Sequence, residues 1–168
     1  MTALISIIMG STSDLPVMEK AADFLNSMHI PFEMNALSAH RTPAEVEKFA
    51  NEAAGRGIKV IIAGAGMAAH LPGVIAAMTP LPIIGVPIKA SLNGMDALLA
   101  IVQMPPGIPV ATVAIDGALN AAILATQMIA TGDPVIFDRL VAYKSELKDK
   151  IVKANEELSQ ISYAYKTN

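Results

Sequence analysis

The stretch that decides the fold is residues 59–78, which read KVIIAGAGMAAHLPGVIAAM. Its first five residues, 59–63, form a short apolar run of the kind found in strands that are buried on both faces. Glycine and alanine dominate residues 64–70, and a short helix is expected over residues 71–78. A buried strand, a small-residue loop and a helix in this order form the repeating unit of a parallel α/β sheet.

The same alternation continues on both sides of this stretch. We expect further strands over residues 4–9, 32–37, 81–86 and 110–115, and further helices over residues 15–28, 43–56, 93–103 and 118–130. The sequence after Gly132 changes character, because residues 134–165 are rich in Lys, Glu and Asp, and we expect them to form a helix. We therefore expect one α/β catalytic domain over residues 1–132. A C-terminal helical extension over residues 133–168 is expected to pack on the core or on a neighbouring subunit.

The composition predicts a homo-oligomer. The chain is 53% hydrophobic and only 16% charged, with a mean hydropathy of +0.48. This is more apolar surface than one small core can bury, and subunit interfaces are the natural place for the excess. A membrane span is the rival explanation, but it needs about 20 consecutive apolar residues. Gly, Pro, His or Asp interrupts every long apolar stretch within that length.

Several classes of protein are excluded by composition. The chain has no cysteine, so disulfides, zinc–thiolate sites and cysteine nucleophiles are ruled out. The formal net charge of −3 provides no basic field for nucleic acid. No group of His, Asp and Glu has the spacing of a metal site. The N-terminal residues lack the basic region of a signal peptide, and we expect a cytoplasmic protein.

Unusual residues follow the first three expected strands. These strands lead into Gly10–Asp14, Ser38–Arg41 and Gly64–His70, which carry Gly, Ser, His and Arg. Ligands of open parallel sheets bind beyond the carboxyl ends of the strands, so these three loops form the candidate site. The stretch from Ser11 to Asp14 precedes a helix. It suits a phosphate and a ribose, or else it is a turn in which Ser13 or Asp14 caps the helix.

The other two loops carry the remaining chemistry. His40 is a candidate proton carrier, and Arg41 can bind phosphate oxygens through its planar guanidinium, unless the two are only an exposed pair. The loop after Gly64 has almost no polar side chain, so its backbone could hold a planar ring or CO2 in an apolar pocket. His70 is either a second ligand contact or, as the residues alone favour, a hydrogen-bonded structural histidine.

Together these motifs resemble one enzyme family, the class I N5-carboxyaminoimidazole ribonucleotide mutases, the catalytic subunits of phosphoribosylaminoimidazole carboxylase. The similarity runs over about residues 3 to 130. The matching stretches are residues 9–14, 38–43, 63–73, 85–87, 92–96 and 101–105. Two departures stand out. Met67 occupies a position where the family usually has a second consecutive glycine, and the stretch from Ile88 to Asn93 is one residue short.

The resemblance implies a three-layer flavodoxin-like fold and a homo-octamer. It implies conversion of N5-carboxyaminoimidazole ribonucleotide to 4-carboxy-5-aminoimidazole ribonucleotide in purine biosynthesis, without metal, nucleotide or organic cofactor. His40 would be the acid and base, Ser11, Ser13 and Arg41 would hold the phosphate, and Asp14 the ribose. The residues that would frame the aminoimidazole and the carboxyl group are Ser38, Gly64, Ala65, Gly66, Ala68, His70 and Leu71.

Two alternatives remain open at the level of sequence. An aminoimidazole ribonucleotide carboxylase would use free CO2 with the same site. A flavodoxin-like binding module would hold the nucleotide without turning it over.

Overall fold

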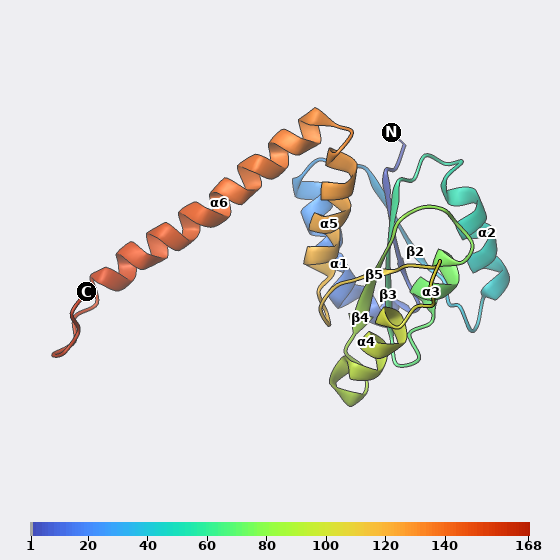
Figure 1. Ribbon diagram of the computed structural model, residues 1–168, viewed down its shortest axis with the longest axis horizontal. Coiled ribbons are helices and arrows are strands. Elements are labelled where there is room, and N and C mark those ends of the chain that lie inside the picture. Colours follow the sequence, from blue (N-terminus) through green and yellow to red (C-terminus); the bar gives the residue numbers. More distant parts are fainter. Residues whose placement is uncertain (1) are drawn as a thin grey trace. The chain divides into compact units, whose positions relative to one another are not determined.

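Five parallel strands form one sheet in the computed structural model, which describes residues 2–168 (Figure 1). The strand order is β2-β1-β3-β4-β5. The strands are β1 (Ile5–Met9), β2 (Phe32–Ala36), β3 (Val60–Gly66), β4 (Ile83–Ile88) and β5 (Ala111–Thr112). The chain moves from β1 to one side for β2 and then to the other side for β3. This reversal between β1 and β3 is the point where doubly wound sheets bind ligands.

Helices cover both faces of the sheet. They are α1 (Leu15–Ser27), α2 (Pro43–Ala53), α3 (Leu71–Ala76), α4 (Met95–Val102) and α5 (Ala118–Ala130), with short 3-10 turns η1 (Thr12–Asp14) and η2 (Leu92–Gly94). Figure 1 shows α1 and α5 together on one face and α2 and α3 on the other. The expected three-layer, flavodoxin-like α/β fold is therefore confirmed.

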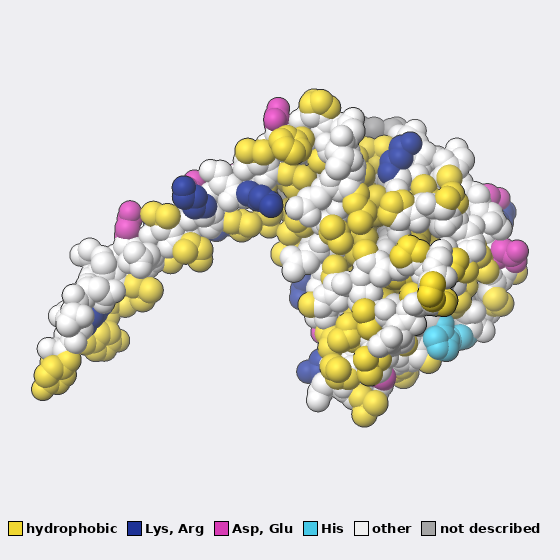
Figure 2. Space-filling model, viewed as in Figure 1, with side chains coloured by type: hydrophobic (Ala, Val, Ile, Leu, Met, Phe, Trp, Pro, Cys, Tyr) yellow, Lys and Arg dark blue, Asp and Glu magenta, His cyan; other side chains and the backbone are white. Residues whose placement is uncertain are grey.

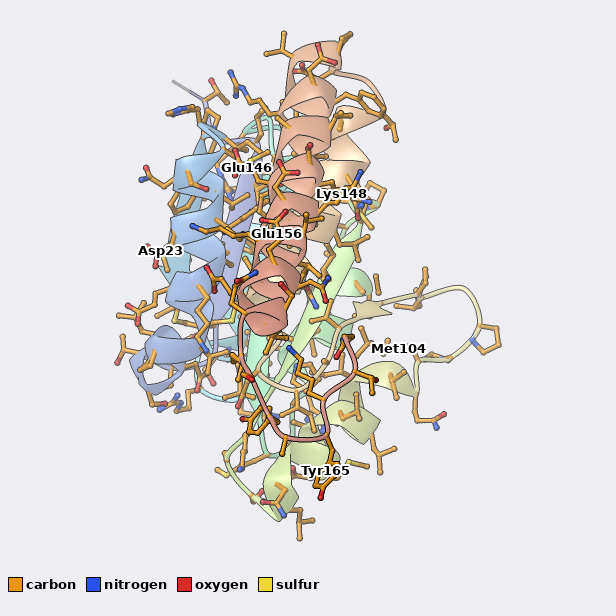
Figure 3. All side chains as sticks on the ribbon, turned by 90° about the vertical axis from the view of Figure 1, so that its left-hand side faces the viewer. Asp23, Met104, Glu146, Lys148, Glu156 and Tyr165 are labelled. Carbon is orange, nitrogen blue, oxygen red and sulfur yellow. The ribbon has the colours of Figure 1, made fainter. Side chains whose placement is uncertain are left out.

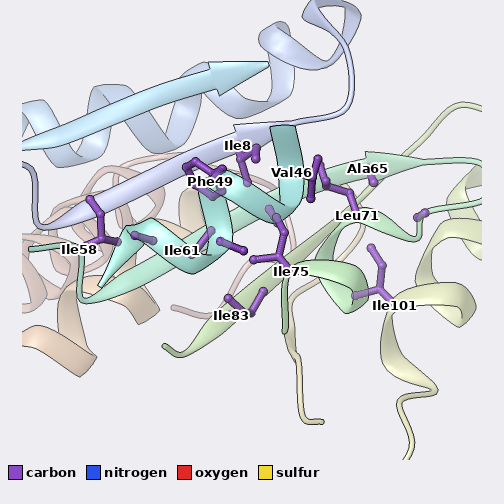
Figure 4. Packing of buried hydrophobic residues seen from close by; sticks show 14 of the residues in the cluster. Ile8, Val46, Phe49, Ile58, Ile61, Ala65, Leu71, Ile75, Ile83 and Ile101 are labelled. Carbon is purple, nitrogen blue, oxygen red and sulfur yellow. The ribbon is translucent and has the colours of Figure 1, made fainter. Parts of the chain in front are cut away.

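The core on the α2–α3 face is aliphatic. Phe49 from α2, Ile75 from α3 and Ile101 from α4 pack with Ile61 of β3 in one buried cluster (Figure 4). The opposite face of β3 packs closely on α1, because a Cβ on Gly64 would lie 2.5 Å from the Met18 sulfur. The central strands β1, β3 and β4 are thus held between two layers of apolar side chains.

The described chain divides into two compact units, one up to Ile129 and a second from Ala130 to Asn168. The second unit is mainly α6 (Pro134–Ser159), whose charged side chains include Glu146, Lys148 and Glu156 (Figure 3). Asp133 caps its first turn, accepting hydrogen bonds from the amides of Val135 (3.0 Å) and Ile136 (3.1 Å).

The last turn of α6 is held by a lysine. Lys166 Nζ donates to the carbonyl oxygens of Ser159 and Ile161, at 3.2 and 2.9 Å. A cation at this place also interacts favourably with the helix dipole. The helix therefore ends at Ser159, whereas the sequence predicted helix as far as residue 165. Among the described residues, no helix combines the length and apolar character that a membrane span requires.

The fifth strand is shorter than predicted. The sequence predicted a strand over residues 110–115, but β5 contains only Ala111 and Thr112. The chain still follows β4 loosely, since the amides of Val113 and Asp116 donate to the carbonyls of Gly85 and Pro87. Pro87 has no N–H to return to β5, so the regular ladder stops there.

Two further details concern β2 and the start of α2. β2 lies at the sheet edge and is half-exposed, with Met34 38% exposed, and so it is not a strand buried on both faces. Thr42 stands at the N-cap of α2, but its hydroxyl makes no capping bond there within the described chain. Instead, Thr42 Oγ1 accepts from the Ser38 amide at 2.9 Å and donates to the Ser38 carbonyl at 3.1 Å.

The tight packing of α4 on β4 gives a test. A Cβ on Gly85 would overlap Ile101 Cγ2 and approach Val110 Cγ1 to 3.0 Å, and Ile101 is fully buried. We expect Gly85→Ala to lower the free energy of unfolding by about 1–3 kcal/mol in urea titrations, the usual cost of overpacking. Gly55→Ala is the matched control, because its Cβ would meet only the Glu52 carbonyl at 3.5 Å. Equal stability of the two variants would contradict the packing described.

Candidate active site

Three loops after β1, β2 and β3 meet around a cleft of about 460 Å³. The loop after β4 adds one residue to its wall. The lining residues are Gly10, Ser11, Ser13, Asp14, Ser38, Ala39, His40, Arg41, Ala65, Gly66, Met67, Ala68, His70, Leu71 and Ala90. The cleft therefore contains every site residue expected from the sequence except Gly64. The position of Gly64 is explained by strand alternation, because its Cα faces Met18 of α1.

The loop after β1 carries hydroxyl groups and one carboxylate at the start of α1. Ser11 Oγ accepts from the Ser13 amide at 3.3 Å, and Ser13 Oγ donates to Asp14 Oδ1 at 3.3 Å. Asp14 is the N-cap of α1 but makes no side-chain capping bond within the described chain. Its carboxylate is therefore not consumed by the helix and remains available to a ligand in the cleft.

Asp14 is held in a partly desolvated environment. Burial raises the pKa of its carboxyl above the ordinary value. The hydrogen bonds from Ser13 and from the loop backbone, together with the nearby Arg41 cation, only partly offset this. Folding thus places an anion where water is scarce, a cost that a ligand hydroxyl could relieve by donating a hydrogen bond.

Arg41 joins the second loop to the first. Its Nη2 atom donates to the Gly10 carbonyl at 2.8 Å, and its Nε atom lies 3.4 Å from Ser38 Oγ. These contacts hold the guanidinium at the mouth of the cleft, while its other N–H groups remain available. Since an arginine with free N–H groups binds phosphate oxygens well, the exposed end of the cleft suits a phosphate.

His40 and His70 form a hydrogen-bonded pair in the cleft. His40 Nε2 lies 2.8 Å from His70 Nδ1, and the rings are nearly perpendicular, at 82°. Only one of the two facing nitrogens can carry a hydrogen. When His40 is cationic, His70 must therefore leave Nδ1 bare and carry its hydrogen on Nε2. His70 thus orients the His40 ring, and its exposed side chain is hydrogen-bonded, as the sequence favoured, and also lines the cleft.

The loop after β3 has a tightly folded backbone. The amides of Ala69 and His70 donate to the carbonyls of Met67 and Ala68, both at 2.8 Å. Met67 has a φ of 53°, in the left-handed region that favours glycine. A non-glycine residue there costs about 1–2 kcal/mol. The departure noted in the sequence therefore coincides with a strained position, and the Met67 side chain is 57% exposed.

The short stretch after β4 also adopts left-handed backbone. Leu92, Asn93 and Gly94 have φ values of 43°, 55° and 84°. Ser91 Oγ donates to Asp96 Oδ2, and this hydrogen bond lowers the pKa of the Asp96 carboxyl. This stretch therefore forms a tight turn that leads directly into α4.

Gly10, Ala39 and Met67 also line the cleft; they lie in the three predicted loops, but no role for them was predicted from the sequence. Ala90 lines the cleft from outside those loops. Ala90 follows β4, which pairs with β3, so the carboxyl end of β4 reaches the same edge of the sheet. Residues 2–168 contain no group of three or more His, Asp or Glu side chains arranged to hold a metal ion.

The environment of Asp14 gives a test of stability. Because its folded pKa is raised, the ionised carboxyl destabilises the native state, and this cost grows as pH rises through its titration. We expect Asp14→Asn to melt at a higher temperature than the wild type at neutral pH. The gain should disappear in acid, where both side chains are uncharged. Thermal melts across pH measure this.

The control for the change in net charge is Asp23→Asn, at an exposed position of the same helix (Figure 3). An Asp14→Asn protein that is less stable than the wild type at neutral pH would show that the carboxylate stabilises the fold.

The comparison with known proteins agrees with this arrangement. The sequence matches the family described as AIR carboxylase over residues 4–150. A relative from Pyrococcus abyssi (strain GE5 / Orsay), named N5-carboxyaminoimidazole ribonucleotide mutase, is 58% identical over 145 residues. The match covers 86% of this chain and 83% of the relative.

Two further similarities extend the comparison. Phosphoribosylaminoimidazole carboxylase of Candida glabrata is 50% identical over 161 residues, which cover 95% of this chain but only 28% of that protein. The crystal structure of Treponema denticola PurE matches with a TM-score of 0.85 and 29% identity, covering 94% of this chain and 99% of that one. Since the family match includes all three cleft loops and most of the chain, this protein belongs to the AIR carboxylase family.

Proposed function

We propose that this protein is an isomerase, an N5-carboxyaminoimidazole ribonucleotide mutase of de novo purine biosynthesis. It would convert N5-carboxyaminoimidazole ribonucleotide to 4-carboxy-5-aminoimidazole ribonucleotide. The observation that carries this proposal is the position of His40, in one cleft with a polar, arginine-bearing end and an apolar loop of small residues. The similarly sized relative named as a mutase, 58% identical, supports the same reaction.

The polar end of the cleft would bind the ribonucleotide. Arg41, Ser11 and Ser13 would hold the phosphate beside the start of α1, where the helix dipole favours an anion. Asp14 would accept hydrogen bonds from the ribose hydroxyls, which would relieve the cost of its burial. Ser38 and the loop from Ala65 to Leu71 would frame the aminoimidazole ring and its carboxyl group. Gly64 would act only indirectly, by letting β3 pack on α1.

His40 would carry the proton in both steps. First, its imidazolium would protonate the carbamate nitrogen. The N–C bond would break with its electron pair on nitrogen, and CO2 would leave. Carbon C4 would then attack CO2, and the neutral imidazole would remove the C4 proton. The rearrangement balances with no metal, redox or nucleotide cofactor. His70 would keep the His40 ring oriented through the 2.8 Å contact.

We also propose that the protein acts as a cytoplasmic homo-oligomer, an octamer by family resemblance. Two exposed apolar stripes support assembly. On α4, Met95, Leu99 and Val102 are 47%, 50% and 48% exposed and lie on one side at helical spacing. On α6, Leu147, Ile151 and Leu158 recur on one side and are also exposed. Figure 2 shows apolar side chains along this helix. The helical extension over residues 133–168 would then cover a neighbouring subunit.

The reaction is tested by supplying each candidate substrate separately. We expect rapid formation of the 4-carboxy product from the N5-carboxylated ribonucleotide and little from aminoimidazole ribonucleotide with CO2. Rapid product from the second mixture alone would identify a carboxylase that uses free CO2. Tight binding of the ribonucleotide without turnover would identify a binding module.

The proton carrier is tested by His40→Asn, because an amide cannot exchange protons as an imidazole does. We expect kcat to fall by roughly 10²–10⁴-fold, the usual contribution of a general acid or base, with substrate binding retained. His29→Asn is the matched control, because His29 lies outside the cleft at the end of α1, with a φ of 53° that Asn tolerates. Undiminished turnover in His40→Asn would disprove this role.

Assembly is tested by sedimentation velocity at micromolar concentration. We expect a stable oligomer for the wild type and partial or complete dissociation for Leu99→Lys, because a charge would enter an apolar contact. Asn26→Lys, at an exposed position of α1, controls for the added charge. A monomeric wild type would refute the proposed assembly.

A further inference from the structure

The left-handed backbone conformation of Met67 is unusual for a residue other than glycine. Non-glycine residues with positive φ in the described chain are His29, Met67, Leu92, Asn93 and Asp116. Of these five, only Met67 lines the cleft. Its side chain is 57% exposed, so within this chain little burial compensates for the strain. A strained residue kept at a candidate site is a reason to look for a function of that residue.

The loop around Met67 is anchored and cannot easily relax. Ala69 and Leu71 are 1% and 3% exposed, which fixes the loop to the core. The two short hydrogen bonds from the amides of Ala69 and His70 fold the backbone between these anchors and β3. The Met67 side chain is therefore held at the cleft by the backbone and is not placed there by its own packing.

Met67 also provides a long apolar side chain, which the rest of the loop lacks. Every other residue between Gly64 and Ala69 is glycine or alanine, so no other side chain of this segment can extend over the apolar end of the cleft. Methionine is unbranched, apolar and flexible. It can move aside while a ligand enters and then cover a small neutral molecule without offering it a hydrogen bond.

The proposed reaction would proceed with less loss of CO2 under such a cover. Between cleavage of the N–C bond and attack by C4, the carboxyl carbon exists as free CO2, which must not escape to water. We propose that the Met67 side chain is the movable apolar wall that retains this CO2 in the cleft. The inference rests on the proposed mutase function and adds to it a residue of this chain that strengthens the retention of CO2, at a position where the family usually has glycine.

The test follows the origin of the transferred carbon. Unlabelled N5-carboxyaminoimidazole ribonucleotide is converted in buffer containing ¹³C-bicarbonate and carbonic anhydrase, and mass spectrometry measures ¹³C in the product at early times. The aminoimidazole ribonucleotide released per product formed is measured in parallel, with enzyme-free samples as the background. The wild type should give little label. Met67→Ala and Met67→Gly should both increase label and release several-fold.

Three variants distinguish the effect of the Met67 side chain from the effect of its backbone conformation. Met67→Leu keeps an apolar side chain of similar size and should behave like the wild type. Met67→Ala removes the side chain but leaves the positive φ strained, whereas Met67→Gly removes both the side chain and the strain. Thermal melts confirm that each variant is folded. An increase in Met67→Gly alone would assign the effect to loop flexibility and overturn the inference.

Two other outcomes also decide the matter. In the first, the wild type converts the substrate, and neither Met67→Ala nor Met67→Gly incorporates more ¹³C than the wild type. The mutase function would then stand, but this result would overturn the inference. A change in oligomeric state with unchanged carbon exchange would also overturn it, by identifying Met67 as an interface residue. If the wild type forms no product from the N5-carboxylated substrate, the proposed function fails first.

Discussion

The candidate site depends on the parallel pairing of β1 with β2 on one side and with β3 on the other. Because the three strands run in the same direction, the loops that follow them meet at one edge of the sheet. The connections through α1 and α2 lie on opposite faces, and this separation opens a crevice between the loops. The hydrogen bond from Arg41 to the Gly10 carbonyl then ties the first two loops together.

The same edge holds two locally unfavourable features. Asp14 keeps a carboxylate in a partly dry position, and Met67 keeps a left-handed backbone in an anchored loop. The buried aliphatic layers beneath these loops supply the stability that tolerates such costs. Ligand sites commonly lower the free energy of unfolding, because groups that bind a ligand lack part of their hydrogen bonding or packing when no ligand is bound.

Sequence patterns predicted helices and strands well where residues within the same segment determine the structure. The helix expected over residues 118–130 is α5 with the same limits, and the helix expected from residue 15 is α1, which begins at Leu15. Prediction failed where a partner strand decided the outcome. The fifth strand stops early because Pro87, on the neighbouring strand, has no N–H to donate.

The sequence by itself determined the order of strands and helices, and with it the three loops that contain His40, Arg41 and the glycines. Those features follow from hydrophobic period and from the local conformational limits of proline and glycine. Only the tertiary structure decided that His70 faces His40 across 2.8 Å and that Gly64 packs on α1 instead of lining the cleft. These outcomes depend on strand register and on which face each side chain meets. Both are set by contacts between segments far apart in the chain.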